Sequence, residues 1–145
     1  MTEIKIGGRV IPLLYTTYEM IAVQREIGCT AFQLREEVFG LKQTDEDDPS
    51  SIVLEVATDP EKTAKLGTLI RILGNAGLEE KGEEPDLTDK WVLRNMKPAL
   101  ILPYAVTVMA EILEGNKVEQ PAAEEQEGPR DLLLEEENAK KPQGN

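Results

Sequence analysis

Carboxylates are the most abundant side chains in this chain that could take part in catalysis or bind a metal. Asp and Glu together number 28, whereas histidine is absent and Cys29 is the single cysteine. Histidine is the commonest general base and metal ligand, and a lone cysteine forms no internal disulfide. Gly7-Gly8 lacks the Gly-Lys-Ser/Thr ending and the directly following helix of a phosphate-binding loop. We therefore expect a binding protein rather than an enzyme, with no cofactor and no metal.

Two local patterns could still do chemistry, and each has a plainer explanation. The acidic run Asp45–Asp48 suggests calcium, but the alternating spacing and the glycine at the sixth position of an EF-hand loop are missing. A solvated acidic loop over 42–51 is favoured. Cys29 lies between two predicted helices without a clear activating cation or base, which favours a small buried side chain over a reactive thiol.

The charge balance limits the class of partner. Lys and Arg number 16, which leaves a formal net charge of -12. Such a surface repels nucleic-acid phosphates and anionic lipid headgroups, so we expect neither nucleic acid nor membrane as a partner. The opening MTEIKIGGRV has no apolar signal core and no basic amphipathic leader, which predicts a cytoplasmic protein. The longest mostly apolar run, 99–110, has 12 residues against the ~20 of a bilayer span, so we expect a core helix there.

The N-terminal residues predict a short β-hairpin. Two β-prone runs, EIKI and RVIPLLYT, flank Gly7-Gly8, which is a two-residue hairpin signal. Pro12 cannot donate a hydrogen bond to a neighbouring strand, so its strand should lie at an edge or break there.

Helix signals follow the hairpin. Thr16 and Glu19 have the spacing of a capping box and Gly28 that of a left-handed end, which predicts a helix over 17–27. A second helix is predicted over 30–40. Asp48-Pro49 resembles the start of a short helix through Val56, although the β-branched residues there leave a strand as the alternative.

The middle of the chain carries the clearest amphipathic helix. Asp59-Pro60-Glu61 is a strong helix start. The apolar stripe that follows packs on a core and comprises Leu66, Leu69, Ile70, Leu73 and Gly77. Residues 78–88 are predicted to form an acidic connector, after which Thr88 caps a short helix containing Trp91.

The segment that begins at Pro98 predicts the most apolar helix. Its polar side is confined to Thr107, Glu111 and Glu114, and its apolar residues spread over more than ~150° of the circumference. A central helix contacted on two sides explains this pattern without a partner. The functional hypothesis is a groove for apolar helices to which four residues contribute: Ile101, Val108, Met109 and Ile112.

The composition changes after residue 116. Residues 117–145 contain eight acids and four bases with few large apolar side chains, which predicts a disordered acidic tail behind a compact domain over 1–116. A short leucine motif over 129–137 contains Leu132, Leu133 and Leu134, and we expect these leucines either to bind a partner or to belong to a merely solubilising tail. The predicted fold class is α+β, mainly α: an N-terminal hairpin, a small helical bundle and this tail.

Three stretches of the sequence resemble the tail assembly chaperones of long-tailed bacteriophages and of prophages of Gram-positive hosts. They are IKIGGRVIPLLYTTYEMIAVQREIG at 4–28, LIRILGNAGLEEKGEEPDLTDKWVLRNMKPA at 69–99 and EGPRDLLLEEENAKK at 127–141. They cover roughly half of the chain, and segment 42–58 is not part of the resemblance.

The resemblance implies a non-enzymatic role in virion morphogenesis. Members of the family bind the tape measure protein, help to recruit tail tube subunits, act in the cytoplasm of the bacterial host and are absent from the mature virion. The resemblance leaves homo-oligomerisation open.

The family also makes a longer product by a -1 ribosomal frameshift. Ala139, Lys140 and Lys141 can be encoded by GCA AAA AAG, which contains a slippery run, so the resemblance implies a slip site at these three residues. The alternative is that the two lysines close an acidic helical turn at its negative end.

Two other functional classes stay open. An acidic inhibitor or DNA mimic would bind a basic host protein, although mimics usually spread carboxylates over one folded face. A structural minor tail protein would remain in the purified particle.

Overall fold

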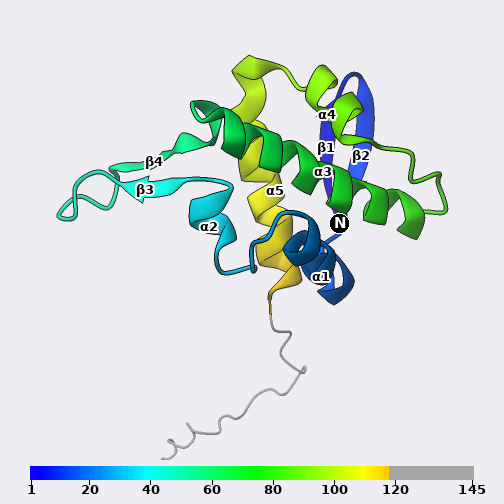
Figure 1. Ribbon diagram of the computed structural model, residues 1–145, viewed down its shortest axis with the longest axis horizontal. Coiled ribbons are helices and arrows are strands. Elements are labelled where there is room, and N and C mark those ends of the chain that lie inside the picture. The colour runs from blue at the N-terminus through cyan, green and yellow to red at the C-terminus, as the bar shows by residue number, and fades with distance from the viewer. Residues whose placement is uncertain (118–145) are drawn as a thin grey trace, which may run out of the picture. The chain divides into compact units, whose positions relative to one another are not determined.

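An N-terminal antiparallel hairpin followed by helices makes up the described part of the chain. The computed structural model describes residues 1–117. The elements are β1 (Thr2–Ile6), β2 (Arg9–Leu13), α1 (Thr17–Glu26), α2 (Leu34–Glu37), β3 (Leu41–Gln43), β4 (Ile52–Leu54), α3 (Pro60–Glu80), α4 (Asp89–Asn95) and α5 (Ile101–Gly115), with 3-10 turns at Glu55–Ala57 and Pro98–Leu100 (Figure 1). The predicted α+β, mainly helical class is confirmed. Predictions for 118–145 fall outside the described residues.

The β1–β2 hairpin forms where the sequence predicts it. Ile6 lies opposite Arg9, and the two residues between them, Gly7 and Gly8, have φ angles of 60° and 77°. Positive φ at both turn positions matches the right-handed twist of the strands, and glycine adopts it without steric cost. Pro12 lies in a two-stranded sheet, so its strand is an edge strand as predicted.

Capping residues fix both ends of α1. The Glu19 carboxylate accepts a hydrogen bond from the Thr16 backbone N–H at 2.9 Å, and Gly28 follows the helix with φ 85°.

The helix predicted over 30–40 is shorter than expected. Residues 31–33 form a turn and only Leu34–Glu37 are α-helical, before Gly40 ends the segment with φ 62°.

A second hairpin replaces the short helix that Asp48-Pro49 suggested. β3 and β4 pair antiparallel, with Leu41 opposite Leu54, and residues 44–51 connect them as the predicted acidic loop. The helix prediction is wrong and its strand alternative is right. The β-branched pair Ile52-Val53 favours extended backbone, and the partner strand β3 supplies the hydrogen bonds.

The central helix is α3. Asp59 caps it by accepting a hydrogen bond from the Glu61 N–H at 3.0 Å, and the whole predicted stripe is buried. The helix runs to Glu80, so Leu78 is a buried helical residue and the acidic connector is shorter than predicted. Thr88 caps α4 as expected, because its hydroxyl accepts the Trp91 N–H at 3.0 Å.

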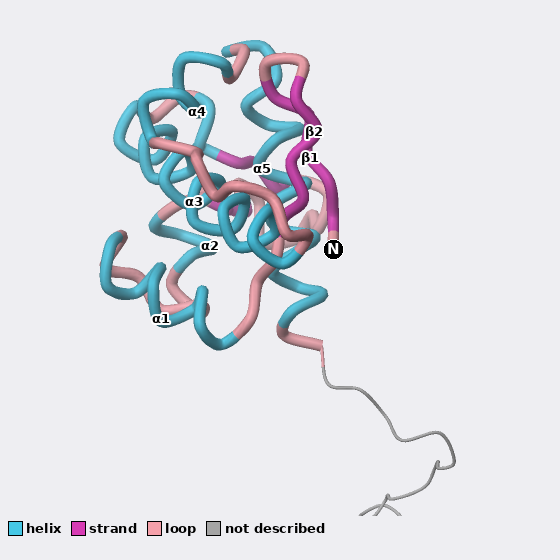
Figure 2. Tube along the Cα trace, turned by 90° about the vertical axis from the view of Figure 1, so that its right-hand side faces the viewer, coloured by secondary structure: helices cyan, strands magenta, loops and turns pink. Residues whose placement is uncertain are grey.

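The first hairpin lies directly on α3. The Leu14 N–H donates to the Leu73 carbonyl of α3 at 3.0 Å. Gly77 permits the contact, since a Cβ there would lie 2.0 Å from the Pro12 carbonyl oxygen. α5 packs along β1 and crosses α3 (Figures 1 and 2), while the β3–β4 hairpin points away from the helices (Figure 1). α5 thus has one face in the core and one face toward solvent.

Candidate partner-binding surface

Local sequence explains where α5 begins. Pro98 starts a 3-10 turn that leads into the helix, a position where its missing N–H costs nothing. Pro103 is also tolerated because it lies within the first turn of α5, where N–H groups have no partner in the helix. The Thr107 hydroxyl donates to the Pro103 carbonyl at 3.0 Å.

A buried carboxylate fixes the rotation of α5 about its axis. Glu111 is 3% exposed, and its two oxygens accept hydrogen bonds from the backbone N–H groups of Thr2 at 2.9 Å and Tyr15 at 3.2 Å. These donors lie at the open end of the β1–β2 hairpin, where Thr2 lies opposite Leu13. A buried charge is tolerated where hydrogen bonds satisfy it. The structure therefore holds one particular face of α5 against the hairpin.

The sequence analysis grouped Glu111 with Thr107 and Glu114 on a polar side of this helix, but the structure places Glu111 on the buried side. The side chain is a strong acceptor for backbone donors that lie far away in sequence, 109 residues away for Thr2. No local pattern reveals such a pairing. The core-facing residues of α5 are accordingly Ile101, Tyr104, Ala105, Val108, Glu111 and Ile112.

The other face of α5 carries an apolar stripe in solvent. Leu102 is 43% exposed, Val106 54% and Leu113 69%, and Met109 is half-buried between them. Their spacing of 4, 3 and 4 residues places all four within about 60° of the helix circumference at ~100° per residue. We call Leu102, Val106, Met109 and Leu113 the α5 stripe.

The α5 stripe has the chemistry of a helix-binding surface. The same alternation of 4 and 3 residues places apolar side chains along one seam in two-helix contacts. Pro103 and Ala110 beside it are exposed and short, which allows a second helix to approach closely.

The four residues predicted to form a groove are divided between the two faces. Ile101, Val108 and Ile112 are core residues with exposures of 8%, 0% and 7%, and Met109 alone contributes to the α5 stripe. Two interleaved sets at helical spacing run along this segment, and apolarity by itself does not say which set is buried. Leu132, Leu133, Leu134, Ala139, Lys140 and Lys141 fall outside the described residues.

A charged cluster joins three helices away from the α5 stripe. Arg71 of α3 pairs with Glu26 of α1 and, from Nε to Oδ1 at 2.8 Å, with Asp89 of α4. Hydrogen bonding to Glu26 and then to Asp89 raises the pKa of Arg71 against the opposing effect of burial. Burial disfavours ionised Asp89, but hydrogen bonds from Arg71 and Thr68 outweigh it and hold its pKa below the usual value. Each of these groups is paired within the fold, so the cluster has a structural role: it links α1, α3 and α4.

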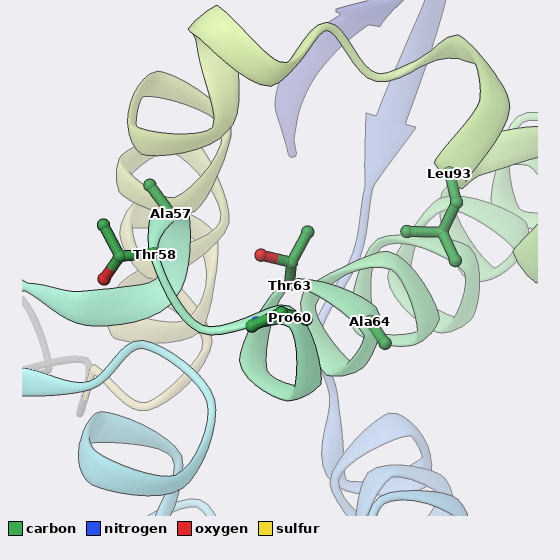
Figure 3. Close-up of a pocket in the computed structure, with 6 residues that line it drawn as sticks. All are labelled: Ala57, Thr58, Pro60, Thr63, Ala64 and Leu93. Atoms are coloured by element: carbon green, nitrogen blue, oxygen red, sulfur yellow. The ribbon is translucent and has the colours of Figure 1, made fainter.

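A shallow hollow of about 330 Å³ lies between the Glu55–Ala57 turn, the start of α3 and α4 (Figure 3). Its lining is mostly apolar: Ala57, Thr58, Pro60, Thr63, Ala64 and Leu93. Both threonine hydroxyls already donate to backbone carbonyls, Thr58 to Glu55 and Thr63 to Val56. The hollow offers apolar contact without convergent polar groups, so it indicates no particular ligand.

The other sequence candidates have plain structural explanations. Cys29 is buried, and desolvation raises the pKa of its thiol. Within residues 1–117, no group of three or more His, Cys, Asp or Glu side chains is arranged to hold a metal ion. In the acidic loop, hydrogen bonds from the Ser50 hydroxyl and N–H hold the pKa of Asp48 below its usual value.

One helix in the described range, Pro98–Gly115, is long and apolar enough to cross a membrane by length and composition, with a mean hydropathy of 1.3. A third of this segment is buried within the protein, and its inner face belongs to the core. The same test accepts core helices of folded domains.

No protein-family model, curated protein or solved structure was found to match the chain. Any argument about function therefore depends on the contacts, burial and charges of the described residues.

Proposed function

We propose that this chain is a non-enzymatic tail assembly chaperone of a long-tailed phage or prophage. In this role it binds the tape measure protein in the host cytoplasm and helps tail tube subunits to gather around it. It is also translated as a longer -1 frameshift product.

The observation that supports the proposal is the α5 stripe. It supplies apolar side chains at the spacing of a helix-packing seam, on a face that the core leaves exposed. In the family that this chain resembles, the tape measure protein is a long helical and aggregation-prone chain. A chaperone for it needs this kind of contact between the apolar faces of two helices.

The charge of the chain supports the same role. A formal charge of -12 keeps a complex with an aggregation-prone client dispersed by mutual repulsion. In this proposal the apolar contact provides affinity for the client, and the negative charge keeps the complex soluble.

The test replaces Val106 with Asp and measures how much tape measure protein stays soluble on co-expression. Burying a carboxylate in an apolar helix contact costs several kcal/mol unless it is paired, so we expect at least a tenfold loss of soluble client. Val10→Asp is a matched control, because Val10 is also 54% exposed but lies on β2, and it should solubilise the client like the wild type.

Two results would contradict the proposal. One is full solubilisation by folded Val106→Asp. The other is a complex that dissociates as salt rises, since an apolar contact persists at high ionic strength whereas a charge mimic releases its partner.

A further inference from the structure

We infer that the α5 stripe also pairs with a second copy of this chain, as an antiparallel two-fold dimer through α5. The inference concerns the protein without any client and does not depend on the proposed function.

The spacing of the stripe is the first argument. The intervals 4, 3 and 4 read the same in both directions. When a second α5 lies antiparallel, Leu102 faces Leu113 of the second copy and Val106 faces its Met109. Each of the four side chains then meets one apolar partner, and each of the two pairs occurs twice, which is the self-complementarity that a two-fold interface requires.

Charge selects the antiparallel orientation over the parallel one. Exposed Lys97 precedes the N-terminal end of α5, and exposed Glu114 lies near its C-terminal end. A parallel pair places like charges and like helix-dipole ends together. An antiparallel pair brings Lys97 toward Glu114 and toward the negative end of the other helix, which is favourable.

The size of the stripe predicts a weak dimer. Four side chains from each copy cover much less than the ~800 Å² per partner of a stable interface, which indicates a dissociation constant in the micromolar range or weaker. The charge of -12 on each copy adds repulsion, which salt screens. The dimer should therefore strengthen as salt rises, and a client that offers a longer seam can displace the second copy.

The experiment is sedimentation velocity of the full chain over a range of protein concentrations, at about 50 mM and about 500 mM salt. We expect the average mass to rise from the monomer value of 16.1 kDa toward twice that value, with more dimer at the higher salt. Val106→Asp should stay monomeric, and Val10→Asp, with the same added charge, should dimerise like the wild type.

Methionine methyl NMR places the interface and checks folding. The Met109 resonance should shift with protein concentration, while those of Met20 and Met96, which lie on α1 and after α4, should stay constant. Unchanged Met20 and Met96 resonances in Val106→Asp establish that this variant is folded. Should it fail to fold, Leu113→Asp at the more exposed end replaces it, with the same expected loss of dimer.

A charge reversal tests the orientation. Lys97→Glu should weaken the dimer several-fold, and adding Glu114→Lys in the same chain should restore it. A chain that stays monomeric at all concentrations overturns the inference, as does a dimer that survives Val106→Asp or that forms without a shift of Met109. Because no client is present, none of these results decides the proposed function.

Discussion

Glu111 holds the core-facing side of α5 against the first hairpin, together with the apolar residues of that side. Its carboxylate accepts two backbone N–H groups in a buried position, and an amide in its place offers a donor where an acceptor is needed. We expect Glu111→Gln to lower the free energy of unfolding by about 1–3 kcal/mol. Urea denaturation measures this change.

Glu114→Gln is the control for Glu111, because Glu114 lies on the same helix and is exposed. It should change the free energy of unfolding by no more than about 0.5 kcal/mol. Equal stability of Glu111→Gln and the wild type would show that the hairpin does not depend on this carboxylate.

Arg71 is the residue whose contribution to the free energy of unfolding should depend on pH. The pKa of Asp89 is depressed in the folded protein, so Asp89 stabilises the fold above its unfolded pKa of about 4 and loses this effect as pH falls through the folded pKa. In Arg71→Met the hydrogen bond from arginine is lost, so burial acts to raise the pKa of Asp89 against the hydrogen bond from Thr68 only.

We expect wild type and Arg71→Met to differ by about 1 kcal/mol at neutral pH, a small value because Glu26 and Asp89 are each 45% exposed. The difference should shrink as pH falls below about 4. Denaturation across this pH range measures it, with Arg25→Met at an exposed site of α1 as control. A difference that stays constant with pH would contradict the role of Asp89.

At the scale of elements, α3 and the first hairpin fit together only because Gly77 has no side chain. A Cβ at this position meets the backbone of Pro12, which cannot rotate away. We expect Gly77→Ala to lower the free energy of unfolding by about 1–3 kcal/mol, despite the better helix propensity of alanine.

Gly67→Ala on the same helix is the matched comparison. The three atoms nearest to a Cβ there all belong to the Leu93 side chain, which is 37% exposed and able to move. The gain in helix propensity, about 1 kcal/mol, should offset that contact. Thermal or urea unfolding of both variants tests this difference, and equal destabilisation would argue against a backbone clash at Gly77.

The elements that could be predicted from sequence are those whose signals are local. Asp59 and Thr88 accept helix N–H groups within three residues, and the Glu19 carboxylate accepts the Thr16 N–H, so the starts of α1, α3 and α4 were predicted correctly. The β3–β4 hairpin was not predicted as such, because Asp48-Pro49 resembles a helix start and the pairing of Leu41 with Leu54 is not visible locally.

The candidate partner-binding surface was also predictable only in part. The sequence identified this segment as the most apolar helix and explained it by contacts on two sides, whereas the structure buries one face of α5 in the core and leaves the other exposed. The orientation of the helix follows from Glu111 and its distant backbone donors, so Leu102, Val106 and Leu113 emerged as the exposed apolar set only from the structure. The sequence shows the 4-3-4 spacing of the exposed set, but it shows an equally regular apolar set on the neighbouring face. The sequence alone does not say which of the two sets is buried.

At the scale of the whole molecule, a strongly acidic chain carries a continuous apolar seam on its most apolar helix. Few soluble monomers leave such a seam without a partner, because exposed apolar stripes promote association. In our account, a client helix occupies the seam during tail assembly and a second copy covers it at other times. Both uses require that α5 keep its present rotation.

The measurement that tests the central claim most directly is site-specific photocrosslinking in cells that also make the cognate tape measure protein. A photoreactive residue at position 106 should crosslink to the tape measure chain, and the same residue at position 10, equally exposed on β2, should not. Crosslinks from position 10 without any from position 106 would contradict the assignment of the α5 stripe as the client-binding surface.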